Sequence, residues 1–91
     1  MNIFEETKRY YVIAGTNAVA IYGSKDELNA HRCYFRNPQI TDHHDLVLAE
    51  FLALNRLRDI LPEHMTPPKY IMPGFIYYRD HPVWLKNRKS H

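Results

Sequence analysis

The side chains best suited to metal binding are six histidines and a single cysteine. Zinc sites need ligands at short, regular spacings, such as two histidines four residues apart on one helix face or a close cysteine pair. The sequence has neither pattern, and the adjacent His43 and His44 would point about 100° apart on a helix. A site assembled from Cys33, His31 and His64 is the alternative left open. We otherwise expect solvated histidines, no metal and no cofactor.

The possible nucleophiles have simpler structural explanations. Ser24 precedes Lys-Asp-Glu, which is the pattern of a helix capping box, and Ser90 lies near the end of the sequence. Cys33 falls in a predicted strand, and cysteine is one of the residues most often buried in a core. The three glycines are far apart and form no phosphate-binding loop. We therefore expect no catalytic residues and no enzymatic activity.

Basic and aromatic residues are mixed in three places, at 8–11, 32–36 and 77–79. Aromatic rings can stack on bases while neighbouring arginines hold phosphates. A strand whose alternate residues fill the core gives the same pattern. Tyr, Trp and Arg are also the favoured anchors of protein interfaces. A protein partner therefore fits the pattern at least as well as a nucleic acid.

These residues must be positioned by a small α+β domain. Strands are predicted at 9–14 and 18–22, because both are rich in β-formers and the Gly-Thr-Asn between them favours a turn. A short helix should come next, capped by Ser24, and then a third strand at 33–35. A long helix at 42–61, capped by Thr41 and ended by a proline, completes the order β-β-α-β-α. The prediction is a small antiparallel sheet packed by one long helix, with an extended C-terminal segment.

The long helix carries more apolar residues than one face can hold. At 100° per residue, a broad stripe expected to face the core contains Leu46, Val47, Phe51, Leu54, Leu57 and Leu61. Leu48 and Leu52 fall on the opposite side, one turn apart. Either another part of the chain folds over these two leucines, or they form a homodimer or partner-binding surface.

Four of the six prolines fall between residues 62 and 73, and the remaining C-terminal residues are rich in aromatic and basic side chains. Proline fixes φ and removes a hydrogen-bond donor, so this part of the chain is expected to be extended. We divide the single domain into a compact core, 1–61, and a contact segment, 62–91. A further strand or arm is possible between residues 71 and 78. The residues expected to bind a partner are Pro67, Pro68, Tyr70, Phe75, Tyr78, Arg79 and Trp84, together with Leu48 and Leu52 of the helix.

Composition and charge set the class of protein. The chain of 91 residues is 45% apolar and 24% charged, which is typical of one globular domain. It has no apolar stretch long enough to span a membrane and no signal-like start, and its lone cysteine suits a reducing compartment, so we expect a cytoplasmic protein. Residues 63–91 hold five Lys or Arg and two Asp or Glu, a balance of +3. That charge is a mild attraction for acidic partners.

Two resemblances suggest a function. The element order, with Tyr10-Tyr11-Val12 before the hairpin and Ile21-Tyr22-Gly23-Ser24 before the first helix, resembles the viroplasmin-like domains that bind RNA–DNA hybrids. The stretch 29–37 lacks that family's Gly-Phe and Tyr-Lys motif. The compact size and the segment Met65-Thr66-Pro67-Pro68-Lys69-Tyr70 resemble, in type, the bacteriophage-encoded modulators of the host RecBCD nuclease. That resemblance implies a non-catalytic host-protein binder and a contact with a host prolyl isomerase at Pro67 or Pro68.

The sequence therefore predicts a non-enzymatic binding protein that modulates a host nucleic-acid-processing enzyme through its Pro-rich, aromatic segment. Two alternatives are kept. One is a nucleic-acid-binding module that uses Arg9, Arg36, Arg79 and Lys86. The other is a structural homo-oligomer joined through Leu48 and Leu52.

Overall fold

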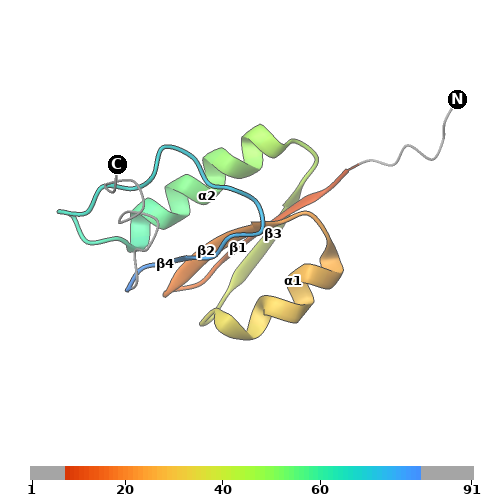
Figure 1. The fold of residues 1–91 in the computed structure, drawn as a ribbon, viewed down its shortest axis with the longest axis horizontal. Helices are drawn as coiled ribbons and strands as arrows, with labels where there is room; N and C mark the ends of the chain where they lie inside the picture. Colours follow the sequence, from red (N-terminus) through yellow and green to blue (C-terminus); the bar gives the residue numbers. More distant parts are fainter. Residues whose placement is uncertain (1–7, 81–91) are drawn as a thin grey trace, which may run out of the picture.

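The computed structural model describes residues 8–80 and confirms the α+β class. A four-stranded antiparallel sheet has the order β3-β1-β2-β4 (Figure 1). In chain order, the elements are β1 (Tyr10–Ala14), β2 (Ala18–Tyr22), α1 (Lys25–His31), the 3-10 turn η1 (Arg32–Tyr34), β3 (Gln39–His43), α2 (Leu46–Ile60) and β4 (Tyr77–Tyr78). The predicted β-β-α-β-α order is thus present, with one short additional strand after it.

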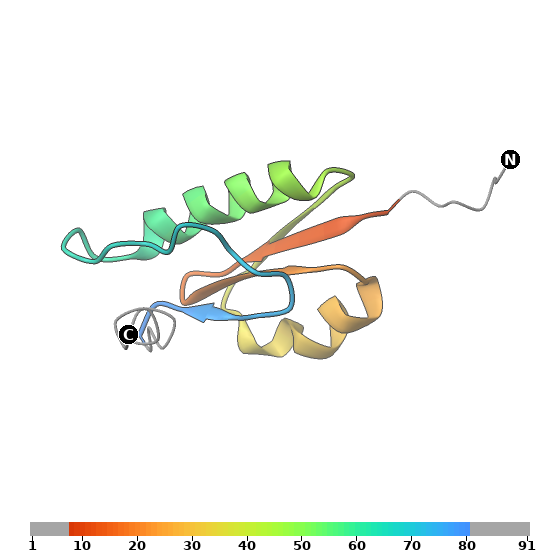
Figure 2. The ribbon, with the colours of Figure 1, turned by 45° about the horizontal axis from the view of Figure 1, so that its top comes forward.

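The two helices lie on opposite faces of the sheet (Figure 2). Successive strand residues point to opposite faces, so each central strand contributes side chains to two hydrophobic clusters, one on each face of the sheet. Val12 packs in the cluster on the α2 face, whereas its neighbour Ile13 packs on the α1 face. β2 is buried along its whole length, because it is covered on both faces and paired on both edges.

The predicted third strand at 33–35 is wrong. Residues 32–34 form η1, and Phe35 closes that turn by donating its backbone N–H to the Arg32 carbonyl. Asn37, with a φ of 46°, then redirects the chain into β3. The sequence did not indicate β3, because this edge strand has a single apolar residue and therefore no alternating apolar pattern. That residue, Ile40, pairs with Ile13.

The start of the long helix and its buried face also differ from the prediction. Asp45 caps α2 by accepting the Val47 N–H at 3.0 Å, and Thr41 lies in β3 instead. The buried positions of α2 are Ala49, Ala53 and Leu57, spaced four residues apart. Small side chains at the first two positions leave room for close packing, so the helix turns its larger residues elsewhere.

The segment after α2 belongs to the same core. Pro68 and Ile71 are buried, and Tyr77 is only 3% exposed in β4, which pairs with β2. Ile71 shares its cluster with Ala49 and Ala53 of α2. The boundary between 61 and 62 therefore separates two stretches of sequence that pack into one hydrophobic core. No helix within residues 8–80 is long and apolar enough to cross a membrane.

Candidate protein-binding surface

Large apolar side chains are exposed on α2 and on the segment after it. Of the exposed large hydrophobic residues between 8 and 80, all except Tyr34 come from these two places. Figures 1 and 2 both show this segment running back along α2 before it turns toward β4. We call the set the apolar surface, and its members are Val47, Leu48, Phe51, Tyr70, Met72 and Phe75.

The helical half of the apolar surface results from the rotation of α2. With Ala49, Ala53 and Leu57 inward, Val47 and Phe51 fall on the outer face, four residues apart. Val47 is 70% exposed and Phe51 is 60% exposed. Both belong to the stripe that the sequence pattern assigned to the core. That assignment is wrong for these two residues, and the Ala-x-x-x-Ala-x-x-x-Leu spacing was the signal for the true buried face.

The second half of the apolar surface comes from an extended stretch in which exposure alternates. Ile71 is fully buried, whereas Tyr70 and Met72 on either side of it are 63% and 55% exposed. In an extended chain, neighbouring side chains point in opposite directions, so burying Ile71 turns both neighbours outward. Burial of Ile71 therefore leaves the aromatic side chain of Tyr70 and the thioether side chain of Met72 exposed to solvent.

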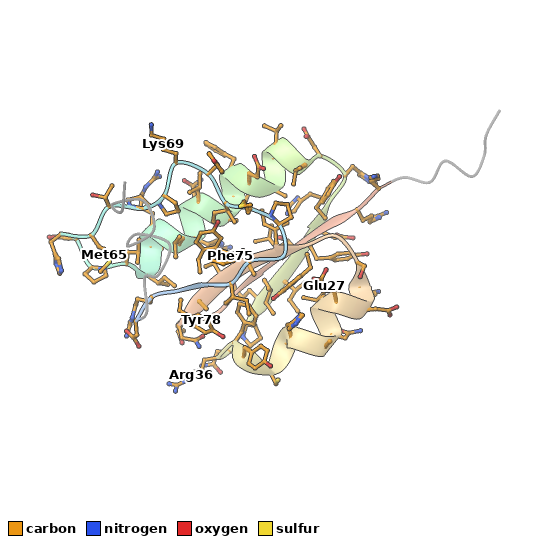
Figure 3. The ribbon with its side chains drawn as sticks, viewed as in Figure 1. Glu27, Arg36, Met65, Lys69, Phe75 and Tyr78 are labelled. Carbon is orange, nitrogen blue, oxygen red and sulfur yellow. The ribbon has the colours of Figure 1, made fainter. Side chains whose placement is uncertain are left out.

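Tyr77 holds the next turn in place. Its hydroxyl accepts the Met72 N–H at 2.9 Å, and its ring meets Phe75 edge to face with centroids 4.9 Å apart. Gly74, at a φ of 85°, donates its N–H to the Ile21 carbonyl at 2.7 Å. Burial raises the pKa of Tyr77, so the hydroxyl that accepts the Met72 bond stays protonated. These contacts give a defined shape to the aromatic end of the apolar surface, which contains Phe75 (Figure 3).

The predicted contact residues have different positions in the structure. Tyr70, Phe75, Arg79 and Leu48 are exposed, whereas Pro67, Tyr78 and Leu52 are half-buried. Pro68 is buried, so its ring packs inside the folded protein. Trp84 lies outside the described residues. Met72 was not singled out from the sequence, because no periodic pattern marks it.

The histidines and the cysteine considered for metal binding do not form a cluster in the part of the chain that the structure describes. Within residues 8–80, no three His, Cys, Asp or Glu side chains are placed to hold a metal ion. His31 stacks between Tyr22 and Tyr34, with centroids 5.2 and 5.8 Å away. Cys33 is exposed, and the expectation that it packs in the core is wrong, because it lies on a surface turn.

Comparison of the chain with protein-family models, with curated proteins and with solved structures finds no match in any of the three.

Proposed function

We propose that this chain is a small non-enzymatic binding protein whose apolar surface docks onto a protein partner. The carrying observation is that the exposed large hydrophobic residues between 8 and 80, apart from Tyr34, come from two segments that lie side by side in Figures 1 and 2. Single exposed hydrophobic residues are normal on a soluble protein, whereas a group of them marks an interaction site. The aromatic and methionine side chains are also the types enriched in interface cores.

The composition of the apolar surface favours a protein over a nucleic acid. None of its six members carries a charge, and the surface brings together aliphatic, aromatic and thioether groups. Such groups gain affinity by leaving water, whereas phosphate binding depends on cations and falls steeply with salt. We therefore expect binding to the partner to depend only weakly on ionic strength.

The finer proposal is that the partner is a host nucleic-acid-processing enzyme of the RecBCD nuclease type, which this chain would inhibit or redirect. It depends on the resemblance of type to the bacteriophage-encoded modulators, and the exposure of Tyr70 and Phe75 is compatible with it. An isomerase contact at Pro68 would have to occur before folding buries its ring, whereas Pro67 is half-buried in the folded chain.

The test uses a double variant of the apolar surface, Phe51→Ser with Tyr70→Ser. Immobilised full-length protein is used to capture host proteins, and each captured protein is then purified and titrated by calorimetry. The expected result is a loss of at least about tenfold in affinity, since two exposed aromatic anchors are removed. The matched control is Tyr34→Ser, which removes an exposed aromatic residue outside the surface.

Three measurements make the result decisive. Far-UV circular dichroism must show that both variants keep the fold. A purified host nuclease assayed with and without the protein tests the finer proposal. Affinity that is equal in the wild type and the Phe51/Tyr70 variant would overturn the role of the apolar surface. Light scattering that shows a dimer broken by the same variant would identify a second copy as the occupant instead.

A further inference from the structure

A second feature lies at the end of the sheet where β1 turns into β2. A hollow of about 340 Å³ is lined there by Thr16, Asn17, Arg36, Tyr78, Arg79 and Asp80. The lining residues come from three separate parts of the chain. Figure 3 shows Arg36 and Tyr78 at this same end of the sheet. None of these residues belongs to the apolar surface.

Asn17 makes hydrogen bonds to the other two parts of the chain that line the hollow. Its side-chain oxygen accepts the Arg36 N–H at 2.9 Å, its side-chain nitrogen donates to the Tyr34 carbonyl at 3.0 Å, and its own carbonyl accepts the Arg79 N–H at 2.9 Å. Thr16 adds a bond from its N–H to the Arg36 carbonyl at 3.1 Å. These bonds use backbone atoms of both arginines, so they fix the backbone from which each arginine side chain extends.

The charge of the hollow is incompletely balanced. Two ion pairs occur within residues 8–80, Arg9–Asp42 and Arg79–Asp80, and neither involves Arg36. The Arg79–Asp80 pair is exposed, with the atoms 3.2 Å apart, and such pairs hold their partners weakly. Two arginines and a single carboxylate therefore line the hollow.

The structure also separates the arginines that the sequence grouped together as candidates. Arg9 is held by Asp42 at 2.7 Å near the start of β1, which is the end of the sheet opposite the turn. Arg36 and Arg79 come together although they are far apart in the sequence. The aromatic residue that lines the hollow is Tyr78, and the exposed Tyr34 is joined to the hollow through its backbone carbonyl, which accepts the Asn17 side chain.

We propose that this hollow binds the phosphate backbone of single-stranded nucleic acid. A guanidinium fork matches phosphate oxygens, and two forks can track the backbone of one strand. Base stacking on aromatic side chains beside such a groove is the usual arrangement in proteins that bind single strands without sequence preference.

The test measures fluorescence anisotropy of a labelled oligothymidine of about 20 nucleotides, with full-length protein at low salt. The key variant is Arg36→Glu with Arg79→Glu. The matched control is Lys8→Glu with Lys25→Glu, which changes the net charge equally at exposed positions away from the hollow. We expect at least a tenfold loss for the arginine variant and a change below about twofold for the control. The slope of log affinity against log salt should become shallower by about 0.7 for each phosphate no longer neutralised.

Three results would overturn the proposal: equal losses in the two variants, no binding of the oligonucleotide at about 50 mM salt, or tighter binding to anionic vesicles than to the single strand. This site is independent of the proposed function. The arginine variant should still capture the protein partner, and the Phe51/Tyr70 variant should still bind the oligonucleotide. Failure of one proposal can therefore be distinguished from failure of the other.

Discussion

Tyr22 is a fully buried side chain whose hydroxyl has no hydrogen-bond partner among residues 8–80. Its ring contributes to the α1-side core and stacks on His31. The ring therefore stabilises the fold by burial, whereas the buried hydroxyl carries a desolvation cost with no bond to offset it. Tyr77 is the opposite case, because its hydroxyl accepts the Met72 N–H.

Replacing each of these tyrosines by phenylalanine should therefore give opposite results. Tyr22→Phe should leave the free energy of unfolding unchanged or raise it by up to about 1 kcal/mol, because it removes an unsatisfied polar atom. Tyr77→Phe should lower it by about 1–3 kcal/mol, because the Met72 N–H loses its acceptor. Urea denaturation measures both. A larger loss for Tyr22→Phe than for Tyr77→Phe would contradict this interpretation of the core.

The burial of Tyr22 also predicts that the free energy of unfolding falls at alkaline pH. Burial, assisted by the charge of Glu27, raises the pKa of Tyr22 from 10.0 to about 12. The unfolded state then loses the proton at lower pH than the folded state. The contribution of Tyr22 to stability is therefore fully present below pH 10 and is lost as the pH rises toward 12. In Tyr22→Phe, stability measured by urea denaturation should fall less over this range, whereas an unchanged pH profile would contradict the burial of the phenol.

Gly15 is required for a close approach of two backbones. A β-carbon at this position would lie 2.9 Å from the Arg36 carbonyl oxygen and 3.0 Å from the Arg36 nitrogen. Gly15→Ala should therefore destabilise the fold by about 1–3 kcal/mol, because backbone has to move. Gly23→Ala is the matched control, since its surroundings are open within 4 Å, and a thermal melt of both variants checks the difference. Equal melting temperatures would show that the turn is not packed against Arg36 as described.

At the scale of the element, α2 has two apolar faces, one buried and one exposed. Leu57→Ala should cost about 2–5 kcal/mol, because it opens a cavity under a fully buried side chain. Phe51→Ser should change stability by less than about 0.5 kcal/mol, because Phe51 is 60% exposed. Chemical denaturation of both variants separates a residue that supports the fold from one available for binding. Similar losses for the two would mean that Phe51 faces the core after all.

At the scale of the whole molecule, residues 62–80 complete the domain. A chain ended after Leu61 would lose the buried Ile71 and Tyr77 and the strand that covers the β2 edge. We expect this truncated chain to lose cooperative unfolding, because both the core and the sheet become incomplete. Near-UV circular dichroism and urea denaturation measure this, with Ile71→Ala as a milder variant expected to cost about 2–5 kcal/mol. A cooperative, native-like truncated chain would contradict it.

The role of residues 62–80 in the core determines how binding should be tested. Removal of the segment after α2 would abolish binding through loss of the fold, whatever surface the partner uses. Point variants of exposed side chains, such as Phe51→Ser and Tyr70→Ser, test the apolar surface without removing core residues.

Local sequence patterns were sufficient to predict the elements that depend only on residues close together in the sequence. Two runs of β-formers around a turn predict the β1–β2 hairpin, and the side chain of Ser24 with its spacing to Glu27 predicts the helix cap, which the structure confirms with a bond at 3.1 Å. Tyr70 and Phe75, which the sequence proposed as contact residues, are exposed. Short-range chemistry determines the hairpin and the cap, and they do not depend on where the rest of the chain lies.

Tertiary packing alone decided the rest. The rotation of α2 depends on which side chains fit between the sheet and Ile71, and two alanines fit where larger residues would not. The position of β3 depends on pairing with β1, and the meeting of Arg36 with Arg79 depends on bonds to Asn17. Each of these contacts joins residues distant in sequence, so no periodicity within a single segment could reveal it.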